Sequence, residues 1–211
     1  YPIATAASSS PTDQSVNIDD SDNAYGDGLL QLVGAEALAY FHSDRMIRRF
    51  VATIDNLPRQ EAPAGKMPVK PVGGPFLVER NSAGMTIDPT NARRYVRYLE
   101  IMAAVDVRRL VDLYVGFYPV FQQAYRELGY PHGRFNDRVV DTLDDLLATP
   151  DVAPPIAVTQ PKVLYEFADP ALEKRSAGQK IMLRMGADNM ARAKRLLSAI
   201  RSELLRRSPG K

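Results

Sequence analysis

The sequence predicts a mainly α-helical single domain of about six helices, with a small antiparallel β-hairpin or three-stranded sheet. Apolar residues recur at steps of three and four over most of the chain, which is the spacing of one helix face. Two short alternating segments flank a turn, as in a β-hairpin. The chain has 211 residues, of which 45% are hydrophobic, so it is long enough to bury one core.

Residues 1–27 are predicted to be a flexible acidic leader or linker, and residues 28–208 the helical domain. The leader is rich in Ser, Asp and Ala, contains no Lys or Arg, and has few large apolar residues. Such a segment buries too little surface to offset the entropy lost on ordering. A strand or arm wrapped on the domain is the alternative interpretation.

Two helices are predicted next. The first covers residues 28–40, and the second ends at Leu57 and begins after Ser43 or Asp44, either of which could cap it. A Pro/Gly-rich connection over residues 58–75 follows. It is long for a compact domain, and such loops are usually functional or mobile.

A β-hairpin is predicted where residues 76–78 and 85–87 flank a turn at 81–84. Because a lone hairpin is marginally stable, we expect it to pack on helices or to pair with a third strand. Residues 163–167 alternate well enough to be that strand. The next helix should open at Asp88-Pro89, with Pro in its first turn, and stop near Asp106.

Residues 110–150 form the centre of the predicted domain. Pro119 interrupts the helix over residues 110–128, so we expect a kink there. Asn136 or Asp137 is expected to cap a second helix that ends at Pro150, and the short connection favours antiparallel packing of the two. The first helix has an apolar face that comprises Leu110, Tyr114, Phe117, Phe121, Tyr125 and Leu128.

The last predicted helix spans residues 178–206 and is basic. From Lys180 onward there are nine Lys or Arg residues against two acidic residues, a net charge of about +7. This helix could contact anionic lipid head groups, nucleic acid or an acidic partner, and a solvated face is the alternative. Asn189 lies on its apolar stripe and should be hydrogen-bonded inside the fold. The whole chain carries only +2, so no sequence-specific nucleic-acid partner is expected.

Few residues of the chain suit catalysis or metal binding. The absence of cysteine excludes disulfides, Cys-ligated zinc, iron–sulfur clusters and thiol nucleophiles. His42 and His132 have no ligand pattern beside them, and the glycines do not form a phosphate loop. We therefore predict no catalytic residue, no metal and no cofactor.

Two polar groups are the best candidates for a binding site: the trio at residues 136–138, and a cluster near the first helices that comprises Arg48, Arg49 and Asp55. Arg138 is placed to pair with Asp55, Glu127 or the carboxylate of a ligand, and structural ion pairs are the alternative. Further along the same predicted helix as Arg138, three carboxylates are predicted to form a solvated face, namely Asp141, Asp144 and Asp145. The candidate binding residues are Arg48, Arg49, Asp55, Glu127, Asn136, Asp137 and Arg138.

Several segments carry a family resemblance. Residues 48–59 read RRFVATIDNLPR, residues 118–131 read YPVFQQAYRELGYP and residues 135–138 read FNDR, followed by shorter pieces at 147–150 (LATP), 167–170 (FADP), 178–180 (GQK) and 184–186 (RMG). In this order, the chain after the leader resembles the bacterial domain-of-unknown-function family 3014. The resemblance implies an envelope protein with an N-terminal membrane anchor and a Pro-rich spacer, and it implies no activity or site residue.

We therefore expect a non-enzymatic binding or scaffold module of the bacterial envelope, with an envelope protein or a cell-wall component as its partner. We expect it in the periplasm, held at the inner membrane by an N-terminal anchor that this chain, which starts at Tyr1, lacks. The alternative is an enzyme acting on an envelope polymer through Glu127, Asp137 and Arg138. It requires these three side chains to converge on one cleft.

Overall fold

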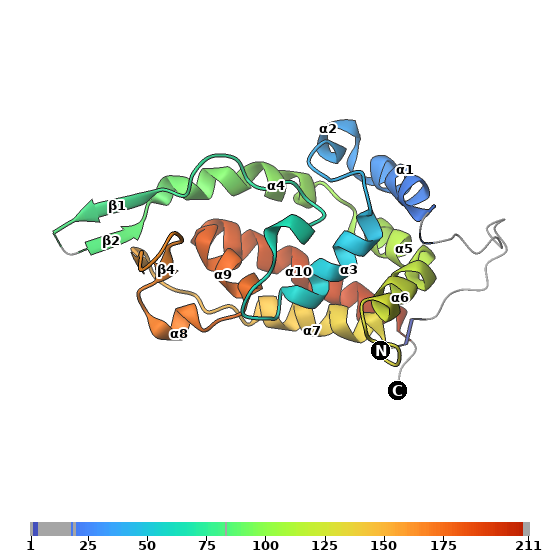
Figure 1. Cartoon of the computed structure of the whole chain (residues 1–211). Coiled ribbons are helices and arrows are strands. Elements are labelled where there is room, and N and C mark those ends of the chain that lie inside the picture. Colours follow the sequence, from blue (N-terminus) through green and yellow to red (C-terminus); the bar gives the residue numbers. More distant parts are fainter. Residues whose placement is uncertain (1, 4–17, 19, 83, 209–211) are drawn as a thin grey trace.

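The computed structural model describes residues 2, 3, 18, 20–82 and 84–208. Within these residues the chain forms ten α-helices and one four-stranded antiparallel sheet. The sheet lies at one end of an elongated helical body, and α1, α5 and α6 lie at the other end (Figure 1). The mainly helical class is confirmed, but the expected six helices and at most three strands were too few.

The helical domain begins earlier than predicted. Its first helices are α1 (Ser21–Val33), α2 (Ala35–Leu38) and α3 (Met46–Asn56). Tyr25 is buried, and its ring packs edge-on against Phe117 and Phe121 at centroid distances of 5.3 and 5.5 Å. The expected boundary after residue 27 is therefore wrong, because residues 21–27 belong to the helical body. Most of the expected leader, residues 1, 4–17 and 19, lies outside the described residues.

The start of α3 is capped from α1. Arg45 occupies the N-cap position with φ +50°, and the amides of Arg45 and Met46 both donate to the Asp22 carboxylate. Ser43 or Asp44 was predicted to supply the capping side chain, and that prediction is wrong. The capping side chain is Asp22, which belongs to the segment that was expected to be flexible. A side-chain cap of this kind typically stabilises by about 1 kcal/mol, and here it also joins two helices.

Pro119 separates two helices and does not kink one. The central helices are α4 (Arg93–Ala103), α5 (Val107–Gly116), α6 (Tyr118–Glu127) and α7 (Phe135–Leu147). The chain breaks at Phe117, which places Pro119 in the first turn of α6, where its missing N–H would have no helical partner anyway. The helix that was expected to stop near Asp106 ends at Ala103, and Asp106 caps α5, with the Arg108 amide donating to its carboxylate at 2.8 Å.

The predicted last helix is also divided. Its parts are α9 (Ala177–Arg184) and α10 (Ala187–Arg207), and the short helix α8 (Pro170–Glu173) precedes them. Gly186 separates α9 from α10 at φ +87°, a conformation that favours glycine. Asn189 donates to the Ala92 and Met185 carbonyls at 2.8 and 2.9 Å, which confirms that it is hydrogen-bonded inside the fold.

The sheet has the strand order β1-β2-β3-β4. Its strands are β1 (Val78–Asn81), β2 (Gly84–Ile87), β3 (Ala157–Thr159) and β4 (Glu166–Phe167). The predicted hairpin is confirmed, but the expected third strand is the fourth, because the unpredicted β3 lies between it and β2. Val158 and Phe167 are buried on one face, where Phe167 packs with Leu172 and Leu183.

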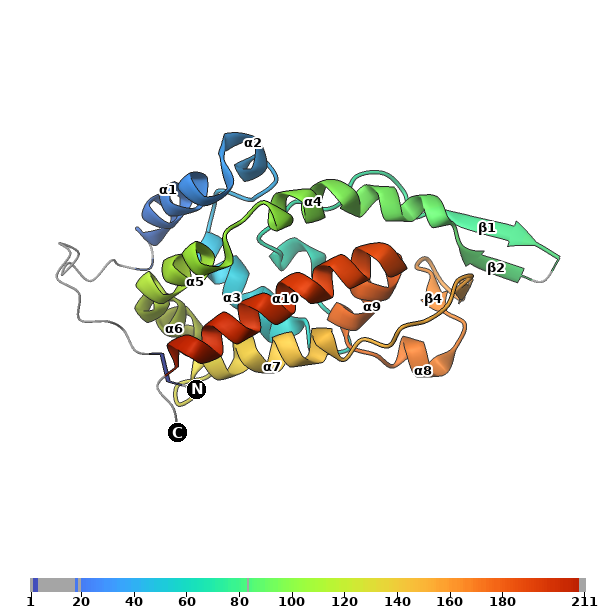
Figure 2. The same ribbon diagram turned by 180° about the vertical axis from the view of Figure 1, so that it is seen from behind.

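The main core lies where α1, α3, α5, α6, α7 and α10 meet, and α10 runs along the back of the body (Figure 2). Phe121 and Phe135 are fully buried and stack at a centroid distance of 5.8 Å. Burying one such side chain contributes about 1.5–3 kcal/mol. The helix α7 contacts α6, but it packs more extensively on α10 and α3. It therefore presents one side to the core and another to the candidate site.

Candidate functional site

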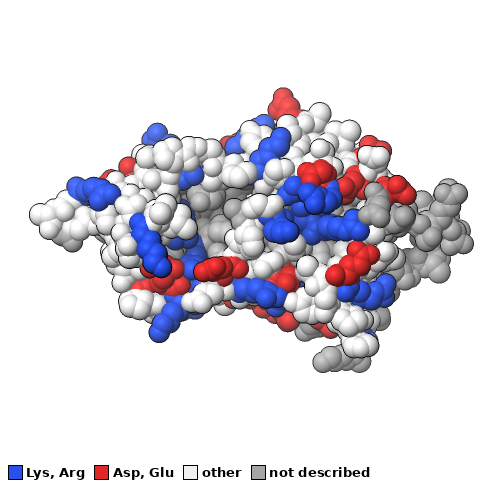
Figure 3. Space-filling model, viewed as in Figure 1, with Lys and Arg blue, Asp and Glu red and all other residues white. Residues whose placement is uncertain are grey.

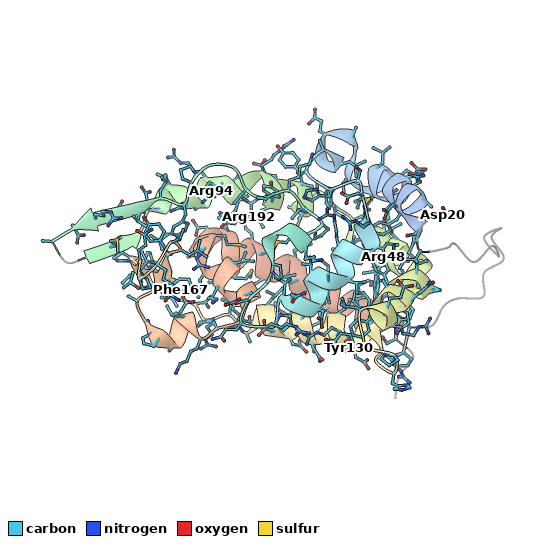
Figure 4. All side chains as sticks on the ribbon, in the orientation of Figure 1. Asp20, Arg48, Arg94, Tyr130, Phe167 and Arg192 are labelled. Carbon is cyan, nitrogen blue, oxygen red and sulfur yellow. The ribbon has the colours of Figure 1, made fainter. Side chains whose placement is uncertain are left out.

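A cavity of about 440 Å³ opens between the end of α3, the connection from α6 to α7, and α7 itself. Tyr130, labelled in Figure 4, lies in that connection. Basic and acidic side chains are interspersed on this face of the molecule (Figure 3). The cavity is lined by Asp55, Arg59, Tyr125, Tyr130, Gly133, Arg134, Asp137, Arg138 and Asp141. Three arginines and three aspartates therefore share one small space.

Asp55 is the buried centre of the cavity, with only 4% of its surface exposed. Nη2 of Arg59 donates to its Oδ2 at 2.7 Å, and Nε of Arg138 lies 3.3 Å from its Oδ1. The Tyr130 hydroxyl accepts from Arg59 Nη2 at 2.6 Å and donates to Asp55 Oδ2 at 3.3 Å. One carboxylate thus holds two guanidinium groups and one phenol in fixed positions.

The end of α3 adds backbone acceptors to the same cluster. The Asp55 carbonyl accepts from Nε of Arg59 at 3.1 Å and from Nη2 of Arg138, and the Thr142 hydroxyl donates to the Ile54 carbonyl at 2.9 Å. The last carbonyls of a helix have no partner within the helix and carry a partial negative charge. The two arginines therefore satisfy both the side chain and the helix end.

The two arginines keep donors available on the cavity side. The side chains of Arg59 and Arg138 are 49% and 23% exposed. In the part of the chain that the structure describes, neither Nη1 atom makes a hydrogen bond. The Asp55 charge raises the pKa of Arg59, so this guanidinium stays charged. The site can therefore offer charged donors to a ligand without rearranging its own ion pairs.

Two tyrosines form an aromatic wall of the cavity. The rings of Tyr125 and Tyr130 stack at a centroid distance of 4.5 Å. Gly133 permits this arrangement, since a Cβ there would lie only 2.9 Å from Cε1 of Tyr125. Burial, and then the charge of Asp55, raise the pKa of Tyr125. Its hydroxyl therefore stays protonated near neutral pH.

Three of the seven predicted site residues come together in this cavity, namely Asp55, Asp137 and Arg138. The prediction that Arg138 pairs with Asp55, one of three partners considered, is confirmed. The partners lie on α3 and α7, 83 positions apart in the sequence.

The other predicted arginines form separate contacts. Arg48 lies 3.2 Å from the Glu127 carboxylate, and neither residue lines the cavity. Arg49 pairs with Asp44 at 3.0 Å and donates to the Gly65 carbonyl at 2.8 Å. Arg48 and Arg49 therefore form structural ion pairs outside the cavity, whereas Asp55, which was grouped with them, lies inside it.

Asn136 is a core residue and not a helix cap. The N-cap position of α7 is Arg134, so the predicted capping by Asn136 or Asp137 is wrong. Asn136 is fully buried, and its Oδ1 accepts from the Tyr114 hydroxyl at 3.2 Å. A buried amide needs such partners, which explains a polar residue at this position.

Several cavity residues were not predicted, among them Arg59, Tyr130 and Arg134. Arg59 follows Asp55 by four positions, which is a spacing that favours ion pairs and could have identified it. Asp141 was predicted to lie on a solvated face with Asp144 and Asp145, and it is exposed but lines the cavity.

Asp145 departs from the predicted solvated face. It accepts from the Ser176 hydroxyl at 2.6 Å and from Nε2 of Gln179 at 3.1 Å. Asp144 is exposed and pairs with Arg201. The three carboxylates therefore have three different environments on one helix.

The basic last helix is partly neutralised by the chain itself. Four of its basic residues pair with carboxylates, namely Lys194, Arg201, Arg206 and Arg207. Among the described residues, no group of three or more His, Cys, Asp or Glu side chains could hold a metal ion, and no helix is both long and apolar enough to cross a membrane.

The sequence model of the family described as "Protein of unknown function (DUF3014)" matches residues 46–201. The chain belongs to this family. The DUF3014 match runs from the start of α3 into α10 and includes all nine residues that line the cavity. A search of curated proteins and a search of solved structures each returned no match.

Proposed function

We propose that this DUF3014 chain is a non-enzymatic binding module of the bacterial envelope, and that the cavity around Asp55 is its recognition site. One observation carries the proposal: a buried carboxylate pairs with two arginines that both line the cavity. A site that is already ordered loses little entropy when it binds. The volume of about 440 Å³ falls in the range of small-ligand sites.

The contacts of Asp55 favour binding over catalysis. Its two carboxylate oxygens are engaged by Arg59, Arg138 and Tyr130. A general base must reach a proton of the substrate directly or through one water. A carboxylate that is buried behind two guanidinium groups is poorly placed for that task and well placed to position them.

The alternative function is an enzyme that acts on an envelope polymer through Glu127, Asp137 and Arg138. Asp137 and Arg138 line the cavity, whereas Glu127 pairs with Arg48 and accepts from Gln123 at 3.0 Å. Because the alternative needs all three side chains in one cleft, this geometry supports it less than it supports binding.

The proposed location is the periplasm, with the module anchored to the inner membrane by an N-terminal segment outside this chain. The family resemblance of the sequence supports this placement. Fractionation of cells that express the full-length gene product should place it with the inner membrane, and protease should reach the domain in spheroplasts. Recovery in the cytosol, or protection in spheroplasts, would contradict the proposed location.

The recognition site is tested by capture from crosslinked envelope with the full-length protein. Arg134 is exposed, and its side chain makes no hydrogen bond or ion pair among those of the described residues, so Arg134→Gln should remove a cavity charge without unfolding the chain. Arg195→Gln, on the exposed side of α10, is the matched control. A specific envelope protein or cell-wall fragment should be captured by the native chain and the control, and lost with Arg134→Gln. Equal capture by all three, or cleavage of the captured polymer, would overturn the proposal.

A further inference from the structure

The cavity carries four of its charges as two parallel columns along α7 and its N-cap residue, Arg134. Arg134 and Arg138 are four positions apart, and so are Asp137 and Asp141. Side chains four apart on a helix lie one above the other, and those three apart are also neighbours. All four residues line the same cavity. A column of arginines therefore runs beside a column of aspartates.

The remaining charged residues of the cavity preserve this balance. Arg59 adds a third positive charge and Asp55 a third negative charge, so the lining carries no net charge. An anionic ligand would be attracted by the arginines and repelled by the aspartates beside them, and a cationic ligand would meet the reverse. A ligand that carries both signs would be attracted by both columns.

The geometry points to a zwitterionic peptide the size of a dipeptide with free termini, an inference that rests on the proposed function. Neighbouring side chains on a helix have Cβ atoms about 5–6 Å apart. The ammonium and the carboxylate of an extended dipeptide are separated by about 7 Å, since each residue spans about 3.3–3.6 Å. A single α-amino acid holds its two charges on one carbon, which is too close to reach both columns.

The cavity wall suits the rest of such a ligand. The planar guanidinium groups can grip the carboxylate with paired hydrogen bonds, which Arg does better than Lys. Arg59 and Arg138 each keep Nη1 available among the described contacts. The half-buried ring of Tyr130, stacked on the buried ring of Tyr125, offers a flat surface to the peptide backbone between the two charges. The ammonium then lies toward Asp137 and Asp141.

The inference is tested by titrating the 211-residue chain with three peptides at low ionic strength. NMR or calorimetry measures the affinity for each peptide. The three peptides are Ala-Ala, N-acetyl-Ala-Ala, which lacks the ammonium, and Ala-Ala-amide, which lacks the carboxylate. Ala-Ala should bind. Each blocked peptide should bind with an affinity that is lower by about tenfold or more, because one charge pair is lost. Equal binding of the three peptides, or no binding of Ala-Ala, would overturn the inference.

Two variants test which side chains bind the carboxylate of the peptide and which bind its ammonium. Arg134→Gln should weaken Ala-Ala but leave Ala-Ala-amide unchanged, because that peptide has no carboxylate to lose. Asp141→Asn should weaken Ala-Ala but leave N-acetyl-Ala-Ala unchanged. Arg195→Gln and Asp27→Asn, both exposed and away from the cavity lining, are the controls. A variant that weakens all three peptides equally would indicate a structural role and contradict the assignment.

The ligand could be a free peptide or a cell-wall peptide that carries an ammonium and a carboxylate on a side chain. Titration with a wall tripeptide ending in diaminopimelate distinguishes these sources, since tighter binding than Ala-Ala identifies the wall. If Arg134→Gln abolishes envelope capture while no peptide binds, the proposed function stands and this inference fails. If capture is unaffected, the proposed function fails.

Discussion

The helix α7 forms polar junctions near both of its ends, and the one near its start borders the cavity around Asp55. Near its start, Arg138 pairs with Asp55 on α3 at the floor of the cavity. Near its end, the Asp145 carboxylate and carbonyl accept from Ser176 and Gln179 of the α9 start. Both junctions join a carboxylate to donors of another element. The junction at Asp55 borders the cavity and is the open junction, and the junction at Asp145 is the closed junction.

The size of the participating side chains accounts for the difference. At the closed junction the Gly178 amide donates to the Leu57 carbonyl at 2.8 Å, and a Cβ at Gly178 would lie 2.5 Å from Cδ2 of Leu146. Glycine and serine let the backbones approach closely. At the open junction, arginine side chains and tyrosine rings line the cavity between the end of α3, the connection from α6 to α7, and α7. Polarity alone therefore does not distinguish a structural contact from a binding site.

Removal of the central carboxylate of the open junction should have the largest effect. Asp55→Ala leaves Arg59 and Arg138 close together without their shared counter-charge. Losing one partner of a buried ion pair costs about 3–5 kcal/mol, and we expect about 2–3 kcal/mol here because both arginines are partly exposed. Urea unfolding followed by circular dichroism measures the change. A loss below about 1 kcal/mol would show that the cluster does not hold the junction together.

Filling the closed junction should have the next largest effect. Gly178→Val places new atoms against Leu146 and the Leu57 carbonyl, and such overpacking costs about 1–3 kcal/mol. The same urea titration should show a lower midpoint, while ligand binding at the open junction is retained. An unchanged midpoint would mean that the two backbones are not in close contact.

The cap of α9 should contribute less. Ser176→Ala removes the acceptor for the Gln179 amide and the donor to Asp145, and losing such a cap costs about 1 kcal/mol. Thermal unfolding measures it, with Ser198→Ala on the exposed side of α10 as the control. The control should be neutral or slightly stabilising, since alanine favours a helix. Equal effects of the two substitutions would contradict a capping role.

An ion-paired carboxylate within one helix should give the smallest effect on stability, and this effect should disappear in acid. Hydrogen bonds from Arg206 and Arg207 lower the pKa of Glu203 from 4.5 to about 2. The lowered folded pKa stabilises the fold above pH 4.5, and this contribution is lost as the pH falls toward 2. The stability difference between the native chain and Glu203→Gln, measured by urea unfolding from pH 6 to pH 2, should therefore shrink over that window. A constant difference would contradict the pairing.

The sequence alone determined the helical class, the hairpin, the family and a helical start at Asp88, which caps a short 3-10 helix at Pro89–Ala92 before α4. These features follow from residues within a few positions of one another, because helix faces, caps and turns are local interactions. The pairing of Arg138 with Asp55 was anticipated only as one of three possibilities. The i,i+4 partner Arg59 was within reach of the same local reasoning.

Tertiary structure alone decided which polar residues meet. Asp22 caps α3 from α1, and Asn136 lies in the core beside Tyr114. Glu127 faces Arg48 and not the cavity. Spacing along the chain cannot specify these pairs, because the partners lie on different elements and their distance depends on how the helices pack. The open and closed junctions of α7 differ for the same reason, since the side chains packed between the helices set the gap.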